Sequence, residues 1–500
     1  MTNRQYPQSN EKASMSSTDQ DHAQGGLLSG MLGTGDIIFM ILACAAPMGV
    51  LAGLIPLALA FGNGAGMPGT QLMISAVMVL FAIGYVRMVP HVRNAGAFYA
   101  YIAASLNKEA GIAAAYTAVV AYICAGASVL GAMAFFASDF VSSALGVDTP
   151  WVLWAVVGIA VISWLGYRKI TMAAKVLAVA LLLEVGLILI LDAMILYDRG
   201  WSGLDFSSFA PSRVFAPGLG IAVIYAINGC IGFEATAIYQ EEARDRKRTI
   251  PRATYGAVLV LGTFYVLSVW CLVLAETPAR VQQVAAADPG RFVTSVAFRY
   301  LGTFGRKALN LLTVTSLFAA ALGFFNNIAR YFFALSRDGL IPERLGRVHP
   351  VHGSPYNACR LLTAVLLGII LLFAVAGLDP LLNLSASLAS MGAVGLEILL
   401  TVTSLAIPVF FARRGEYSLG KTLAPLLSGI IIGIATVLSL ANYKALTGTT
   451  LVIVNTLPLL FLVTALGGIV HGVYLRRKAP ENYARVGTTQ VEGDVAPAAA

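Results

Sequence analysis

Charged residues are scarce in this 500-residue chain. Asp, Glu, Lys and Arg together make up 12% of it, whereas 58% of the residues are hydrophobic and the mean hydropathy is +0.78. Because a soluble globular domain carries about 25% charged residues, this composition excludes a soluble protein and indicates an integral membrane protein. The Lys and Arg residues are scattered in short segments beside apolar runs, which argues against a nucleic-acid-binding surface.

Cysteine and histidine are also rare, with five residues of each. The cysteines lie in or beside apolar segments and show neither metal-ligand spacing nor an extracellular pair, so we interpret them as small buried hydrophobic residues. The histidines lie in tails, at the ends of apolar segments and in loops, and none has a catalytic partner in the sequence. A phosphate-binding loop is lacking too. We therefore expect no enzyme, no cofactor, no metal site and no ATP-driven transport by this chain alone.

Long apolar runs are what the chain has in abundance. A run of about 20 apolar residues is long enough to cross the hydrocarbon core of a bilayer as a helix. We therefore expect an all-α integral membrane protein with about 12 transmembrane helices. The predicted spans are residues 32–60, 70–89, 111–145, 151–167, 172–197, 217–241, 253–275, 305–335, 358–377, 381–411, 421–441 and 452–475.

The polar ends of the chain and its basic residues predict the orientation. Residues 1–30 are largely polar and contain no apolar core of a signal peptide, so we expect a cytoplasmic tail. With this tail inside, 25 of the 33 Lys and Arg residues fall on the inner side, as the positive-inside rule requires. The sequence thus predicts a multi-pass protein of the plasma membrane (the cell inner membrane), with a second cytoplasmic tail at residues 478–500.

Helix-breaking residues occupy the middle of the first and sixth predicted spans. The first contains "ACAAPMGV", with Pro47 and Gly49, and the sixth contains Asn228, Gly229 and Gly232. Proline removes a helical hydrogen bond, and broken backbone survives in lipid only where protein or a water-filled cavity satisfies it. Each of these spans opens a group of five, which is typical of an inverted repeat that holds substrate between two discontinuous helices. Ordinary packing roles for these residues are the alternative.

This pattern predicts a transporter core at residues 31–411, with repeats at about 31–197 and 217–411, followed by two additional spans at 412–477. A broken helix exposes backbone N–H groups, which attract a carboxylate, while its freed carbonyl groups accept from an ammonium group. An α-amino acid needs both. The predicted substrate-binding residues are Ala46, Pro47, Met48, Gly49, Asn228, Gly229, Ile231, Gly232 and Phe233.

Three motifs resemble the amino acid–polyamine–organocation (APC) superfamily of permeases. "GFEATAIYQEEARDRKRTIPRA" is similar to that family's segment after the sixth helix, and "NNIARYFFALSRDGLIPERLGRVHPVHGSPYNA" to the end of its eighth. "LGTGDIIFM" followed by "HVRNAGAFYAYI" resembles its first helix and the loop after the second. The resemblance covers about residues 27–475. It implies a LeuT-type 5+5 inverted repeat with discontinuous helices 1 and 6, plus two extra helices.

The sequence departs from the family pattern in two places. Members commonly carry a Gly-Ser-Gly-type break in the first helix, whereas this chain has "AAPMG", in which Pro47 lacks an N–H group. Many proton-coupled members carry a lysine in the fifth helix, and counting along "AAKVLAVALLLE" places Glu184 at that position in this chain. These departures weaken the expectation of carboxylate binding at the first break and bring a carboxyl group into the membrane instead.

Carboxyl groups inside a span are costly and usually mark a functional pathway. We predict that Glu184 and Glu234 serve coupling or proton transfer, with Glu184 able instead to pair with a substrate ammonium group. A protonated glutamate bonded to a neighbouring helix is the alternative for Glu184, and a helix cap for Glu234. Glu397 is a weaker candidate, and Asp192 is expected to be solvated near the outer end of its span.

The charged run after the sixth span predicts an inner mouth. Glu242 and Arg248, together with Arg337 and Asp338 after the eighth span, are predicted to form salt bridges of an inner gate, with a solvated loop as the alternative. Sodium coupling would need hard oxygen ligands. Hydroxyl groups of span eight are candidates, but the following "LFAAALGFF" is apolar, which favours protons or exchange.

The sequence as a whole predicts a permease that moves an amino acid by alternating access, in symport with protons or by exchange. A carrier of polyamines or of ethanolamine-like amines is the alternative within transport. A channel or a non-transporting sensor is less favoured, because the sequence shows neither a repeated selectivity motif nor an appended signalling domain. The particular substrate, the coupling ion, the direction of transport and the oligomeric state stay open.

Overall fold

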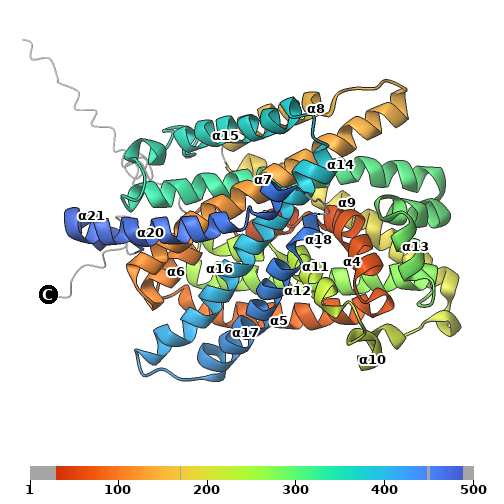
Figure 1. Ribbon diagram of the computed structural model, residues 1–500, viewed down its shortest axis with the longest axis horizontal. Helices are drawn as coiled ribbons and strands as arrows, with labels where there is room; N and C mark the ends of the chain where they lie inside the picture. The colour runs from red at the N-terminus through yellow and green to blue at the C-terminus, as the bar shows by residue number, and fades with distance from the viewer. Residues whose placement is uncertain (1–29, 169, 448–450, 488–500) are drawn as a thin grey trace, which may run out of the picture.

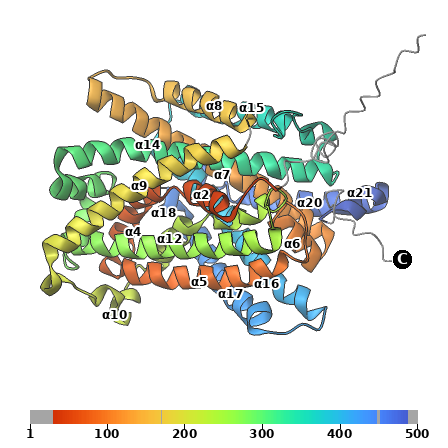
Figure 2. The same ribbon diagram turned by 180° about the vertical axis from the view of Figure 1, so that it is seen from behind.

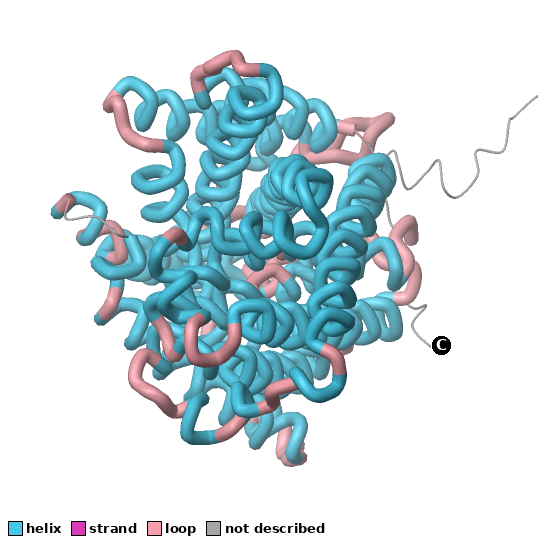
Figure 3. Tube along the Cα trace, turned by 90° about the vertical axis from the view of Figure 1, so that its right-hand side faces the viewer, coloured by secondary structure: helices cyan, strands magenta, loops and turns pink. Residues whose placement is uncertain are grey.

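The computed structural model describes residues 30–168, 170–447 and 451–487. Every regular element in these ranges is a helix, and an isolated bridge pairs Leu32 with Ala243. The long helices run roughly alongside one another, as Figures 1 and 2 show from opposite sides. Figure 3 looks along the bundle and shows the helices packed together, with most of the loops toward the outside.

In the described ranges, most of the bundle is made of fourteen helices, to which segments of seven residues or fewer are joined. These helices are α2 (Thr34–Cys44), α4 (Ile55–Phe61), α5 (Met67–Met88), α6 (Phe98–Ser105), α7 (Lys108–Leu145), α8 (Trp151–Tyr167), α9 (Ile170–Arg199), α11 (Leu219–Cys230), α12 (Arg246–Glu276), α14 (Phe292–Arg337), α15 (Tyr356–Val375), α16 (Ala386–Ala412), α17 (Ala424–Ala441) and α20 (Leu459–Lys478). The other segments are α3 (Pro47–Gly49), η1 (Val50–Leu54), η2 (Gly64–Gly66), η3 (Trp201–Gly203), η4 (Ser207–Phe209), α10 (Pro211–Val214), η5 (Phe233–Tyr239), α13 (Val281–Ala287), η6 (Pro289–Arg291), η7 (Glu343–Gly346), η8 (Pro380–Ser385), η9 (Leu419–Leu423), α18 (Tyr443–Thr447), α19 (Val452–Asn455) and α21 (Pro480–Arg485).

Each predicted span overlaps one of these helices. In the described ranges, ten helices are long and apolar enough to cross a membrane. The fourth predicted span, α8, is apolar but only 17 residues long, and the fifth, α9, is not among the ten. The all-α membrane fold is therefore confirmed, and the count of 12 spans stays a prediction.

The long helix α14 has a break that explains its length. At Gly302 the backbone takes φ 66° and ψ −161°, so two helices meet at a kink. A positive φ of this kind favours glycine, because it has no Cβ. The part after Gly302 matches the predicted eighth span, residues 305–335. The part before it lies between the seventh and eighth predicted spans.

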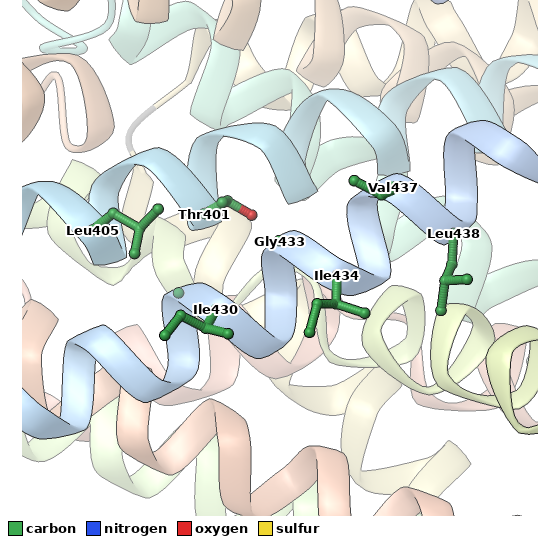
Figure 4. A pocket seen from close by; sticks show the side chains of 8 residues that line it. Thr401, Leu405, Ile430, Gly433, Ile434, Val437 and Leu438 are labelled. Atoms are coloured by element: carbon green, nitrogen blue, oxygen red, sulfur yellow. The ribbon is translucent and has the colours of Figure 1, made fainter.

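Apolar helix faces on the outside of the bundle form shallow grooves rather than a polar site. Figure 4 shows a groove of about 380 Å³ between α16 and α17, lined by Thr401 and otherwise by Leu, Ile, Val and Gly residues. Ile430 and Ile434 in its wall are among the exposed large hydrophobic residues. Such a surface suits lipid hydrocarbon, so a polar binding site is expected inside the bundle.

Candidate functional site

The first predicted break is present between α2 and α3. Ala46 takes a left-handed conformation (φ 47°, ψ 66°), and Pro47 follows at the first position of the next helix. Pro47 suits that position because the first helical N–H group lacks an intrahelical acceptor and the proline ring already fixes φ. The sequence therefore stops α2 at Cys44 and restarts the helix with Pro47, Met48 and Gly49.

The restarted helix offers the backbone donors of Met48 and Gly49 at the first break. The N–H group of Val50 donates to the Ala46 carbonyl (2.9 Å), so it is used within the helix. Met48 and Gly49 lie in the first turn, where N–H groups have no intrahelical acceptor. Their N–H groups point the positive end of the helix dipole toward the break.

The second predicted break lies between α11 and η5. Gly232 has φ 124° and ψ −32°, a conformation that residues with a Cβ rarely adopt, and Phe233 then begins a 3₁₀ helix. Here the N–H groups are engaged by the protein itself. Ile231 donates to the Asn228 carbonyl (3.3 Å), and Gly232 donates to Oε2 of Glu234 (2.7 Å).

The two breaks face each other in the interior. A Cβ built on Gly232 would lie 3.6 Å from Cα of Ala45, and one built on Gly229 would lie 3.0 Å from Cγ1 of Val50. Ala45, Met48 and Phe233 are buried. The predicted substrate-binding residues of both spans are therefore brought together, and all of them are buried except Gly49 and Asn228, which are partly exposed.

The carboxyl group of Glu234 lies at the centre of the second break. Besides the Gly232 N–H group, it accepts a hydrogen bond from the Tyr122 hydroxyl (3.2 Å), while the Tyr85 hydroxyl donates to the Glu234 backbone carbonyl (2.8 Å). Glu234 is fully buried. The protein's own carboxylate thus occupies a donor that the sequence assigned to the substrate.

Aromatic rings surround this carboxyl group. Tyr122 packs near Tyr331, and Phe81 lies edge-on to Phe233, with ring centroids 6.1 and 5.7 Å apart. Tyr116, also on α7, lies apart from these rings, and its hydroxyl is 2.5 Å from Nδ1 of His471. A buried carboxyl group among aromatic faces is an environment that suits a cationic group.

The carboxyl group of Glu184 on α9 lies beside the first break. Its carboxyl group faces the Met48 backbone N–H group and the Ser316 hydroxyl of α14. Yet neither its oxygens nor the Ser316 hydroxyl has a hydrogen-bond partner within the described ranges. Since buried polar groups are nearly always satisfied, these atoms mark a place where a proton, a water molecule or a substrate group is needed.

The other two membrane carboxyl groups have different surroundings. Asp192 is buried and accepts a hydrogen bond from Ser268 of α12 (2.6 Å), so the prediction that it is solvated was wrong. Glu397 is buried on α16 near Ser439 of α17, and its two oxygens have no partner among the residues described. The neighbours of these two carboxyl groups lie on α12 and α17 and belong to neither break.

Ion pairs gather at the end of the bundle where α2 begins and α14 ends, which we call the gate end. Arg337 makes a two-pronged pair with Glu241 (2.8 and 2.9 Å). Arg330 pairs through Nε with both oxygens of Glu242 (3.1 Å each) and lies over the Tyr239 ring. Backbone hydrogen bonds join Leu32 to the loop that carries these glutamates.

Asp338 at the gate end lies 3.9 Å from Nε of Arg337 and also binds neutral donors. Its carboxylate accepts from the Asn94 amide (2.9 Å) and from the Tyr99 hydroxyl. Arg248, by contrast, pairs with Asp245 on the exposed first turn of α12 (3.6 Å). Three of the four predicted gate residues are therefore brought together and Arg248 is not, while the gating role of all four stays a prediction.

Several residues of the site were missed at the level of sequence. Arg330 is a charge within the apolar run "NNIARYFFAL", and that position alone indicates a buried partner. Asn327 carries a weaker signal, yet it links the breaks: it accepts from the Tyr239 hydroxyl of η5 (2.6 Å) and donates to Sγ of Cys44 (3.7 Å). Nothing in the local sequence identifies Asn94 or Tyr99 as partners of Asp338.

The Arg330–Glu242 pair gives a test of stability. Arg330→Met would leave a buried carboxylate without its counter-charge, which costs about 3–5 kcal/mol. We expect a large fall in the unfolding temperature of the purified protein. The double variant Arg330→Met/Glu242→Leu should recover most of it, because no buried charge is left over.

Arg360→Met is the matched control, because Arg360 is exposed and lies over Tyr356 on the surface. It should leave the unfolding temperature nearly unchanged. If Arg330→Met behaves like Arg360→Met, the buried pair does not stabilise the gate end.

Comparison with known proteins gives matches over most of the chain. The family profile described as "Amino acid permease" matches residues 36–483. The low-affinity putrescine importer PlaP of Escherichia coli K12 is 26% identical over 319 residues, which cover 61% of this chain and 66% of that protein. The branched-chain amino acid permease BcaP of Bacillus subtilis is 24% identical over 322 residues, covering 59% and 66%.

The chain spans just under two thirds of the length of these relatives. Among solved structures, a Na⁺-coupled sialic acid symporter in a substrate-bound outward-open state is similar, with a TM-score of 0.48 and 14% identity. That match covers 84% of this chain and 93% of the symporter.

Proposed function

Since this chain belongs to the amino acid permease family, we propose that it is a secondary active transporter that moves an amino acid across the plasma membrane by alternating access. The observation that carries this proposal is the meeting of two interrupted helices, with Gly232 against Ala45, in the buried centre of the bundle. Irregular backbone at membrane depth is tolerated where it lines a binding site.

The two breaks together supply the groups that an amino acid needs. The N–H groups of Met48 and Gly49 are suited to its carboxylate. The carboxyl group of Glu234 and the freed carbonyl groups at the end of α2 are suited to its ammonium group. We propose that the two charged ends of the substrate divide between the breaks in this way.

An amine importer is the second candidate, and the state of Glu234 favours it. The Gly232 N–H group already binds the carboxylate of Glu234, so the second break presents negative charge rather than a receptor for it. A diamine would satisfy Glu234 and Glu184 without needing any carboxylate donor. The putrescine importer among the relatives is consistent with this alternative.

We further propose that transport is coupled to protons through Glu184 or proceeds by exchange, and that the gate end faces the cytoplasm. The unpartnered carboxyl group of Glu184 beside Met48 supports the first point. The gathering of Lys and Arg on the side of both termini supports the second.

Uptake into proteoliposomes tests these proposals. Labelled amino acids and diamines would be supplied to the purified protein with and without an inward proton gradient. Accumulation of an amino acid is expected, and a preference for putrescine-like diamines would favour the second candidate. Failure to move any member of either class above protein-free liposomes would contradict both.

A further inference from the structure

The chain returns to the gate end after its last long helix. Beyond α20 the short helix α21 continues outward at the left of Figure 1, and is followed by Val486 and Gly487. Val486 is only 1% exposed although it lies close to the end of the described residues. A terminal segment is usually poorly ordered unless contacts hold it, so the burial of Val486 indicates that contacts hold this segment in place.

Two residues at the start of α7 hold α21 in place. Nζ of Lys108 donates to the backbone carbonyls of Tyr483 (2.9 Å) and Ala484 (2.6 Å), and also lies over the Tyr483 ring. These carbonyls belong to the last turn of α21, where a cation is favourable. The Tyr483 hydroxyl in turn donates to Oε2 of Glu109 (3.0 Å).

Gly487, which follows α21, forms a hydrogen bond with Asp338 of the gate end. The N–H group of Gly487 donates to Oδ2 of Asp338 (3.1 Å), the same carboxylate that holds Asn94 and Tyr99. Gly487 has φ 69°, and a Cβ built on it would lie 3.1 Å from Cβ of Ala103 on α6. A left-handed glycine is therefore what allows the tip to turn in between α6 and the end of α14.

We propose that residues 480–487 form a latch that fastens the end of α14 to α6 and α7 and so holds the gate end closed. Opening at this end requires the Asp338 contacts to separate, and the latch adds the Gly487 hydrogen bond and the Lys108 contacts to what must be broken. The latch presupposes the proposed transport function for its biological meaning, but its physical effect is independent of any substrate.

Amide hydrogen exchange on the purified protein in nanodiscs measures this effect without a substrate. One variant ends at Lys478 and lacks the latch, and its matched control ends at Gly487 and keeps it. Without the latch, exchange in peptides covering residues 91–97 and 236–244 should become about tenfold faster, the change expected from losing one charge-assisted hydrogen bond. The control should exchange like the full chain.

A point substitution distinguishes release of the latch from a general loss of folding. Lys108→Met should speed exchange in the same peptides, whereas Lys478→Met, which removes an exposed charge from the end of α20, should not. The proposal is overturned if both truncations behave alike, if neither changes the gate peptides, or if exchange rises equally across the whole bundle. None of these outcomes bears on whether the proteoliposomes take up an amino acid.

Discussion

Glu184→Gln is expected to abolish accumulation driven by a proton gradient while substrate exchange continues. Glutamine has nearly the shape of glutamate and can face Met48 and Ser316 in the same way, but it cannot take up or release a proton. Net accumulation against a gradient should therefore fall to the level of protein-free liposomes. Counterflow, in which labelled and unlabelled substrate exchange without net movement, should stay within a few fold of the wild type.

The position of Glu184 is the reason for expecting so selective a loss. Its side chain is 1% exposed, and it faces the start of the restarted helix and the hydroxyl of Ser316. An ionised carboxylate in such a place would lack a counter-charge, which is costly in a low-dielectric interior. Movement of α3 away from α9 would open the carboxyl group to solvent, and this links its protonation to the state of the first break.

One control and two contrary outcomes test this role of Glu184. Glu343→Gln, at an exposed position in η7, is the control and should behave as wild type. Wild-type accumulation by Glu184→Gln would remove this residue from coupling. Loss of exchange together with accumulation would show that the carboxylate binds substrate, as the amine alternative requires.

Local patterns predicted the interruptions of the helices well. Pro47 and Gly232 mark both breaks because proline and glycine act on the backbone of their own position, whatever surrounds them. The conformation of Gly302 within α14 follows the same rule. Hydropathy alone predicted only that the eighth span begins near it, at residue 305.

Partners across the bundle were harder to predict. The sequence placed Glu242 and Arg337 in one gate, but Arg337 pairs with Glu241 and Arg330 pairs with Glu242. Glu241 and Glu242 are adjacent, so a small rotation of the chain decides which of them meets which arginine. That rotation is set by the packing of η5 against α2 and α14, which no local pattern encodes. The engagement of Gly232 by Glu234 corresponds to the helix cap that the sequence left open as the alternative for Glu234.

Gly232→Val is expected to reduce substrate affinity by about ten- to a hundredfold, because residues with a Cβ are strained by of order 1–3 kcal/mol in such conformations. At φ 124° a β-branched side chain would force the backbone to rotate. The Gly232 N–H group would then turn away from Glu234, and the new methyl groups would press on Ala45. Both breaks would change shape together, since they touch at this point.

The measurement is the affinity for the best substrate of the uptake panel, with Gly232→Ala as a milder variant. Alanine should give an intermediate loss, since it shares the strain at φ but lacks the branched methyl groups. Gly368→Val on α15 is the control, because a Cβ there meets nothing within 4 Å. Unchanged affinity in Gly232→Val, with normal folding, would mean that the substrate binds elsewhere than between the two interrupted helices.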